Sequence, residues 1–430
     1  MLSHALSSQA LFRSVTRTSV PPSRRRTPMV TGLVGAVVTA VASAVLVPLA
    51  PAVAAERPAF YEAPAQLPSR DGDLIRSEKM DFLLDPARVH TVGHTATRVL
   101  YKSRNRTGRA TAVSGTVIVP KARWVGVGSR PVIGYAVGTQ GIGDSCAPSR
   151  QFSEGFEYEA IFMAGLLARG YAIAMTDYEG LGTAGTHTYM DRVSQGRAVI
   201  DSVRAAQRLP GTGLSATSPV AFYGYSQGGA GAASAAELAG SYGSELKVKG
   251  TVAGAAPADL RQLPGAIDGS LFSMFGWFAI AGLTASYGVD MAPYLNPAGR
   301  AMYAKVQDAC VLDLFDAAFT RSNDYTVDGA GLAELIQREP FKQMIDDQRI
   351  GRTKPSAPVL VTHSRFDDVV PFPVAEQMVR DWCAKGAKVR FSPNLTPLHV
   401  GGMLNNATEV YGFLEARLLG LPMISSCGRV

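Results

Sequence analysis

The stretch that most constrains this fold is Gly224-Tyr225-Ser226-Gln227-Gly228, which joins an apolar strand-like run at 220–225 to a small-residue helical pattern at 228–239. Between a strand and a helix, G-x-S-x-G is typical of a nucleophile elbow, a sharp turn that exposes a serine hydroxyl. The flanking glycines leave room for the strained turn. The N–H of Gln227, at the start of the helix, faces a reacting carbonyl and is a candidate oxyanion donor. The alternative is a serine in an ordinary glycine-rich turn.

Apolar β-rich segments alternate with helical patterns along most of the remaining chain. We expect strands at 97–101, 114–119, 131–137, 171–177, 220–225, 247–253, 358–362 and 388–391, and helices at 156–169, 192–208, 228–239 and 373–384. This alternation predicts a mostly parallel sheet flanked by helices, which with the serine elbow is an α/β-hydrolase fold. The rhythm stops between 257 and 355, where only helical patterns occur. We therefore expect a core of residues 56–256 and 356–430, with an N-terminal arm at 56–90 and a helical cap or lid at 257–355.

A nucleophilic serine needs a histidine base and an acid that orients it, and in this fold the chain order is Ser, Asp, His. Of the six histidines, only His363 and His399 follow Ser226. His399 comes after the last predicted strand, where the base belongs, and we select it. His363 is interpreted as a hydrogen-bonded residue at a strand end. The acid lies in the turn that contains Asp367 and Asp368, and spacing alone does not separate the two.

The first 55 residues contain five arginines and no acid, in a chain of 430 residues with a net charge of +7. Arg24-Arg25-Arg26, a long uncharged stretch and Ala52-Val53-Ala54-Ala55 predict a signal peptide at 1–55, cleaved near Ala54 or Ala55, and hence a secreted protein. An uncleaved membrane anchor is the alternative. Because basic and acidic residues are interspersed after the leader, we expect no nucleic-acid partner.

Four cysteines remain in the exported chain: Cys146, Cys310, Cys383 and Cys427. An even number in an exported protein predicts two disulfides, with three possible connectivities, and the alternative is four unpaired cysteines. Their spacing does not match a metal site, so we expect no metal.

Several of these motifs together resemble the secretory lipases of the lipase A type, over about residues 60 to 427. The resemblance rests on the following stretches: Tyr223-Gly224-Tyr225-Ser226-Gln227-Gly228-Gly229, Asp367-Asp368-Val369-Val370-Pro371, His399, Gly138-Thr139-Gln140-Gly141 with Cys146-Ala147-Pro148-Ser149, and Asp177-Tyr178-Glu179-Gly180-Leu181-Gly182. It implies that Asp367 is the acid and that the backbone N–H of Gln140 is the second oxyanion donor, although yeast members carry an acid where this chain has Gln140. It also implies disulfides Cys146–Cys310 and Cys383–Cys427, and no metal or organic cofactor.

The predicted cap contains an uncharged run at 269–289, rich in Leu, Phe, Met and Trp. It is interpreted either as the buried core of a helical cap or as an acyl-binding surface that includes Leu271, Phe272, Met274, Phe275, Trp277 and Phe278. The resulting hypothesis is a serine-dependent triacylglycerol lipase. It acts on lipids or small esters, touches lipid interfaces transiently and needs no obligate protein partner. The alternatives are a short-chain esterase or acyltransferase, a secreted serine peptidase, and a binding module with a decayed site.

Overall fold

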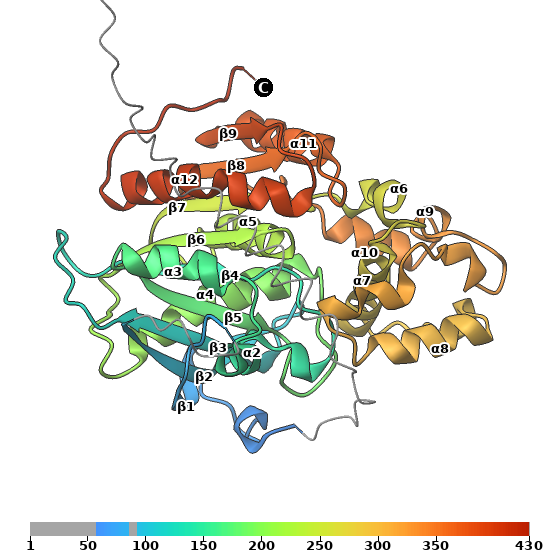
Figure 1. Cartoon of the computed structure of the whole chain (residues 1–430), viewed down its shortest axis with the longest axis horizontal. Coiled ribbons are helices and arrows are strands. Elements are labelled where there is room, and N and C mark those ends of the chain that lie inside the picture. The colour runs from blue at the N-terminus through green and yellow to red at the C-terminus, as the bar shows by residue number, and fades with distance from the viewer. Residues whose placement is uncertain (1–56, 86–92, 430) are drawn as a thin grey trace, which may run out of the picture. The chain divides into compact units, whose positions relative to one another are not determined.

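Figure 1 shows the computed structural model, which describes residues 57–85 and 93–429. A 9-stranded sheet crosses the molecule in the order β1-β2-β3-β5-β4-β6-β7-β8-β9. The strands are β1 (Leu74–Met80), β2 (His94–Arg104), β3 (Ala110–Pro120), β4 (Val132–Ala136), β5 (Ala172–Tyr178), β6 (Pro219–Tyr225), β7 (Lys247–Gly254), β8 (Val359–Ser364) and β9 (Val389–Asn394). The predicted leader at 1–55 lies outside the described residues.

Strands β4 to β9 pair in parallel, whereas β1, β2 and β3 form an antiparallel end that joins β5. The predicted α/β-hydrolase fold with a mostly parallel sheet is therefore confirmed. Strand β1 falls in the segment interpreted as an N-terminal arm, and that interpretation was incomplete. Its sequence LIRSEKM is half-exposed and charged because it forms the edge of the sheet, so it lacks the apolar run of a central strand.

Helices cover both faces of the sheet. They are α2 (Pro148–Glu154), α3 (Ala160–Ala168), α4 (Arg192–Arg208), α5 (Gln227–Leu238), α11 (Phe372–Ala384) and α12 (His399–Leu418), with short 3₁₀ turns η2 (Ala59–Tyr61) and η3 (Asp144–Cys146). Successive residues of β6 identify the two layers. The ring of Tyr223 stacks on Phe162 of α3 at a centroid distance of 4.6 Å. The ring of Phe222 lies on the other face, where the position of a Cβ on Gly134 would touch both it and Val203 of α4.

The segment between β7 and β8 is helical, as predicted, and stands beside the sheet in Figure 1. It contains η4 (Leu260–Gln262), α6 (Pro264–Ile267), α7 (Ser273–Tyr287), η5 (Ala292–Tyr294), α8 (Pro297–Val306), η6 (Val311–Ala317), η7 (Ser322–Asp324), α9 (Leu332–Leu335) and α10 (Phe341–Asp347). We call residues 257–355 the cap. Among the described residues, no helix is long and apolar enough to cross a membrane.

Two disulfides join distant parts of the chain. Cys146, beside the loop after β4, pairs with Cys310 of the cap at a Cα–Cα distance of 5.4 Å. Cys383 at the end of α11 pairs with Cys427 near the C-terminus, at 5.3 Å. These are the pairings that the resemblance implies.

Candidate active site

Ser226 occupies a strained turn between β6 and α5. Its φ of 59° and ψ of −125° lie outside the conformations that most residues adopt. The turn closes tightly, since a Cβ on Gly224 would come 2.1 Å from the carbonyl oxygen of Gly228, and one on Gly228 would come 2.1 Å from that of Ala136. The N–H of Ser226 donates to the carbonyl of Gly254 on β7, at 2.9 Å. The sequence therefore forms the elbow geometry, with Ser226 at its apex.

Asp367 and His399 meet at the carboxyl ends of the last strands. Asp367 Oδ2 accepts a hydrogen bond from His399 Nδ1 at 2.7 Å, while Oδ1 accepts the N–H groups of Val369 and Val370 at 2.9 and 2.8 Å. Burial alone would raise the pKa of the Asp367 carboxyl. The hydrogen bond from His399 and the charges of His399 and His363 outweigh burial, so the pKa lies below its usual value. The carboxylate thus stays ionised and orients the imidazole.

Asp368 contacts the same histidine at a different atom. Its Oδ1 accepts the backbone N–H of His399 at 2.8 Å, at the first residue of α12. The two aspartates that spacing leaves unresolved therefore differ in position. Asp367 holds the imidazole ring, and Asp368 holds the start of the helix.

The position of His399 is also tied to the serine strand. Tyr225, the residue before Ser226, donates its hydroxyl proton to the carbonyl oxygen of His399 at 2.7 Å, and the two rings lie 5.1 Å apart. In the described part of the chain, His399 Nε2 is buried and has no hydrogen-bond partner. Since Nδ1 donates to Asp367, Nε2 is free to accept a proton.

His363, the other histidine in the required order, lies behind Asp367. It is fully buried, its Nε2 is 2.8 Å from the carbonyl oxygen of Val370, and the same nitrogen is 3.5 Å from Asp367 Oδ2. Burial lowers the pKa of His363, despite the opposing effect of Asp367. This position fits the interpretation of His363 as a hydrogen-bonded residue at a strand end.

Gln140 and Gln227 are both buried, in the loop after β4 and at the first position of α5. The N–H of Gln227 has no carbonyl to bond within its own helix, as at any first helical position. The side-chain amide of Gln227 lies 3.1 Å from His187 Nε2, and His187 Nδ1 lies 2.9 Å from the carbonyl of Glu179. Burial lowers the pKa of His187 to about 4, so this ring is neutral and supports Gln227. His187 precedes Ser226, so the required chain order excluded it as the catalytic base. Its contact with Gln227 could not be predicted from sequence spacing.

The loop that carries Gln140 is attached to the cap. The N–H of Val311 donates to the carbonyl of Gln140 at 2.7 Å, and the N–H of Ile142 donates to the carbonyl of Ala309 at 2.9 Å. Gly141 pairs with Cys310 in an isolated antiparallel bridge, next to the Cys146–Cys310 disulfide. Gly141 has φ 126°, and a Cβ there would come 2.3 Å from the carbonyl oxygen of Ala309. Glycine at this position lets the cap backbone approach.

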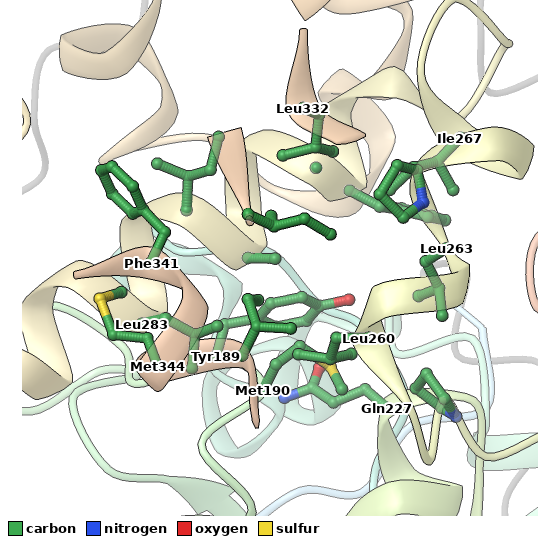
Figure 2. A pocket seen from close by; sticks show the side chains of 18 of the residues that line it. Tyr189, Met190, Gln227, Leu260, Leu263, Ile267, Leu283, Leu332, Phe341 and Met344 are labelled. Atoms are coloured by element: carbon green, nitrogen blue, oxygen red, sulfur yellow. The ribbon is translucent and has the colours of Figure 1, made fainter. Parts of the chain in front are cut away.

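An apolar cavity opens between Ser226 and the cap. Figure 2 shows Leu260, Leu263 and Ile267 on one side of it, Leu283, Phe341 and Met344 on the other, and Gln227 and Tyr189 below. Val369 and Val370, which hold the Asp367 carboxylate, also line it.

The uncharged run supplies both a cap core and a cavity wall. Met274 and Phe278 of α7 are fully buried, whereas Phe275, Ala279, Ile280 and Leu283 of the same helix line the cavity. Of the six residues proposed from the sequence as an acyl surface, only Phe275 lines it. The other five do not line this cavity, and the sequence does not show which face of α7 points inward. The segments η4, α9 and α10 also line the cavity, but their sequences contain no motif that would have predicted this.

The profile of the family described as Secretory lipase matches residues 149–426. The chain belongs to the secretory lipase family. This secretory lipase is 29% identical over 388 residues to the secreted triacylglycerol lipase LIP7 of Malassezia globosa, covering 86% of this chain and 80% of the relative. It is also 26% identical over 375 residues to a probable inactive lipase of Mycobacterium tuberculosis, with coverage of 85% and 82%. The fold is similar to that of Candida antarctica lipase A in its closed state, with a TM-score of 0.75, 21% identity and coverage of 86% and 87%.

Proposed function

We propose that this secretory lipase hydrolyses triacylglycerols through a Ser226-His399-Asp367 triad and an acyl-enzyme. The observation that carries the proposal is an apolar cavity that opens onto an elbow serine. The hydrogen-bonded Asp367 and His399, which follow strands β8 and β9, supply the acid and the base. The secreted triacylglycerol lipases among its relatives support the choice of substrate.

In the proposed reaction, Ser226 Oγ attacks the ester carbonyl while His399 Nε2 takes its proton. Asp367 keeps the imidazole in the tautomer with the proton on Nδ1 and stabilises the imidazolium that forms. The backbone N–H groups of Gln227 and Gln140 stabilise the oxyanion. His399 then protonates the leaving alcohol and later activates the water that releases the fatty acid. No metal or organic cofactor takes part in these steps.

The acyl chain is proposed to lie in the cavity, against the apolar faces of α7 and α10. Each buried methylene of substrate contributes about 0.8 kcal/mol of transfer free energy. The cavity wall is mostly aliphatic and aromatic and has few polar groups to pair with a peptide backbone, which favours a lipid over a peptide substrate.

Contact with a lipid interface is proposed to occur beside the triad. Five exposed apolar side chains lie in the segments that carry Asp367 and His399: Phe366, Leu395, Leu398, Val400 and Leu404. An apolar cluster of this kind on a soluble enzyme is typical of an interaction surface. The relatives named as secreted support the proposal that this chain is exported. The proposed cleavage near Ala54 or Ala55 rests on the sequence alone.

The test compares the secreted protein with Ser226→Ala on p-nitrophenyl esters from acetate to palmitate and on emulsified triacylglycerol. We expect serine-dependent turnover on long chains and on the emulsion, together with labelling of Ser226 by a fluorophosphonate. Turnover limited to short soluble esters would reduce the assignment to an esterase. An unlabelled serine with no ester turnover would contradict the proposal and place the chain with inactive relatives.

A further inference from the structure

Three consecutive residues in the loop between α2 and α3 run alongside the loop that carries Gln140. Glu159 Oε1 accepts the N–H of Gly138 at 2.7 Å, and the hydroxyl of Tyr158 donates to the carbonyl of Thr139 at 3.1 Å. The side-chain amide of Gln140 donates to Glu157 Oε1 at 3.2 Å. A Cβ on Gly138 would come 2.6 Å from Glu159 Oε1, so the two segments are closely packed. Each of residues 157–159 therefore forms a hydrogen bond with one residue of 138–140, in reverse order along the chain.

The two buried glutamates in this segment have different partners. Glu159 accepts the Gly138 N–H and, through Oε2, the hydroxyl proton of Tyr135 at 2.6 Å. Two donors of this kind stabilise a carboxylate. Burial raises the pKa of Glu159 to about 7, against the opposing effect of these hydrogen bonds. Glu159 is thus the member of the pair that is better suited to carry a charge.

Glu157 Oε1 accepts the Gln140 amide, and the backbone N–H groups of Glu159 and Ala160 also act on the Glu157 carboxyl, where they favour its charged form against burial. Its second oxygen, Oε2, is buried without a hydrogen-bond partner among the described residues, and so is Oε1 of Gln140. These unpaired acceptors belong to two planar groups that one hydrogen bond already joins. A buried acceptor without a donor costs about 1–3 kcal/mol. One proton on Glu157 Oε2 would satisfy both atoms, because it donates to Gln140 Oε1.

We propose that Glu157 is a protonated positioning residue, whose carboxylic acid forms a ring of two hydrogen bonds with the Gln140 side chain and so fixes the second oxyanion donor. The inference rests on the proposed function, because Gln140 matters to catalysis only if its N–H binds the oxyanion. With glutamate at residue 157, the ring forms only when the carboxyl is neutral. It also forms when the acid and the amide are exchanged between the two positions.

The surroundings of Glu157 favour the neutral form. The titratable groups that face the glutamate pair are the two acids themselves and the hydroxyls of Tyr135, Tyr158, Tyr178 and Tyr223. Within residues 57–85 and 93–429, no Lys, Arg or His forms an ion pair with either glutamate. Burial, together with the charge of Glu159, raises the pKa of Glu157 well above its usual value. Ionisation at high pH would break the ring, so activity should fall as pH rises.

The first test removes the ring and then restores it. Glu157→Leu should lower kcat by up to about 10²–10³-fold, the cost of losing one oxyanion donor, with little change in KM. Exposed Glu154 on α2 is the matched control, and Glu154→Leu should leave kcat at the wild-type level. Gln140→Glu places a second carboxyl group next to Glu157, removes the amide donor and should also lose activity. The exchange Gln140→Glu with Glu157→Gln restores one acid and one amide and should recover it.

Further measurements separate positioning from a merely structural role. In Glu157→Gln an amide pair makes the same two bonds without a titratable proton, so the alkaline decline of kcat/KM in the wild type should disappear. At pH 8 the infrared spectrum of the wild type should show the carbonyl band of a protonated carboxylic acid, and Glu157→Gln should lack it. The inference is overturned if Glu157→Leu retains wild-type kcat, if the exchange is no better than Gln140→Glu, or if the infrared band is unchanged. If the wild type has no Ser226-dependent turnover, the proposed function fails on its own, and the infrared comparison still decides whether Glu157 holds a proton.

Discussion

Replacement of Asp367 by asparagine tests the proposed catalytic pair through the tautomer of His399. The N–H groups of Val369 and Val370 both point at Oδ1 of Asp367, at 2.9 and 2.8 Å. In Asp367→Asn the amide oxygen would therefore stay there, and the NH₂ group would turn toward His399 Nδ1, which now lies 2.7 Å from Oδ2. Nδ1 must then accept, which leaves the ring proton on Nε2. In that tautomer the imidazole cannot take the proton of Ser226.

The size of the effect follows from these contacts. Flipping the amide to rescue the tautomer would break two backbone hydrogen bonds, at about 1.5 kcal/mol each, which is about 3 kcal/mol. At 1.36 kcal/mol for each factor of ten, that accounts for about 10²-fold in rate. Loss of the buried charge that stabilises the imidazolium adds to it, and we expect a fall in kcat of about 10⁴-fold in total.

Asp368→Asn is the matched control. Its amide oxygen can still accept the backbone N–H of His399, and the imidazole is untouched, so kcat should fall by less than about tenfold. The assay is kcat on a soluble p-nitrophenyl ester, with thermal unfolding to show that both variants are folded. The reasoning is refuted if Asp367→Asn keeps more than about a tenth of wild-type kcat, or if Asp368→Asn is the more damaging change.

Three other predictions follow from the cavity, the surface and the buried acids. Ala279→Phe fills the cavity wall and should suppress turnover of long-chain esters more than short ones, whereas Ala285→Phe, on the exposed side of α7, should not change the chain-length profile. The double variant Val400→Asp with Leu404→Asp should weaken adsorption to triacylglycerol emulsions in a sedimentation assay, while hydrolysis of soluble esters persists. The control Val127→Asp, at an exposed site in another segment, should adsorb normally. Equal loss of adsorption in both variants would contradict a local docking surface. Burial raises the pKa of Asp177 to about 6, above its unfolded value of about 4. Its contribution to stability is therefore present below pH 4 and lost as pH rises to 6. In melting curves, Asp177→Asn should flatten the change in Tm over that interval, and an unchanged slope would refute the assignment.

The elbow could be predicted from the sequence because its chemistry is local. Gly224, Ser226 and Gly228 lie within five residues, and the strand before them and the helix after them are strongly patterned. Asp367 and Asp368 could not be separated by spacing, since their difference lies in which atom of His399 each one reaches. The resemblance to the family selected Asp367, and this is the aspartate that contacts the imidazole. Strand β1 was missed because an exposed edge strand carries charges in place of a buried apolar run.

Contacts that depend on tertiary packing left no sequence signal. The predicted helix at 156–169 begins later, at Ala160, and the residues before it form the loop that contacts 138–140. Glu157 and Glu159 look like ordinary acids in a helical pattern, and only the folded chain shows that they are buried. The cavity wall combines four separate pieces of the cap, so no single stretch of sequence describes it.

The attachment of the cap to the Gln140 loop affects how this enzyme could be re-engineered. Ala309, Cys310 and Val311 contact the loop through backbone groups as well as the disulfide, so they support the Gln140 loop although they lie in the cap. A chimera that imports a relative's entire cap would replace these residues and disturb the loop. A graft restricted to residues 260–295 would exchange the part of the cavity wall that η4, α6 and α7 supply and leave that attachment intact. The choice of graft boundary therefore decides whether the proposed oxyanion loop is changed together with the cavity wall.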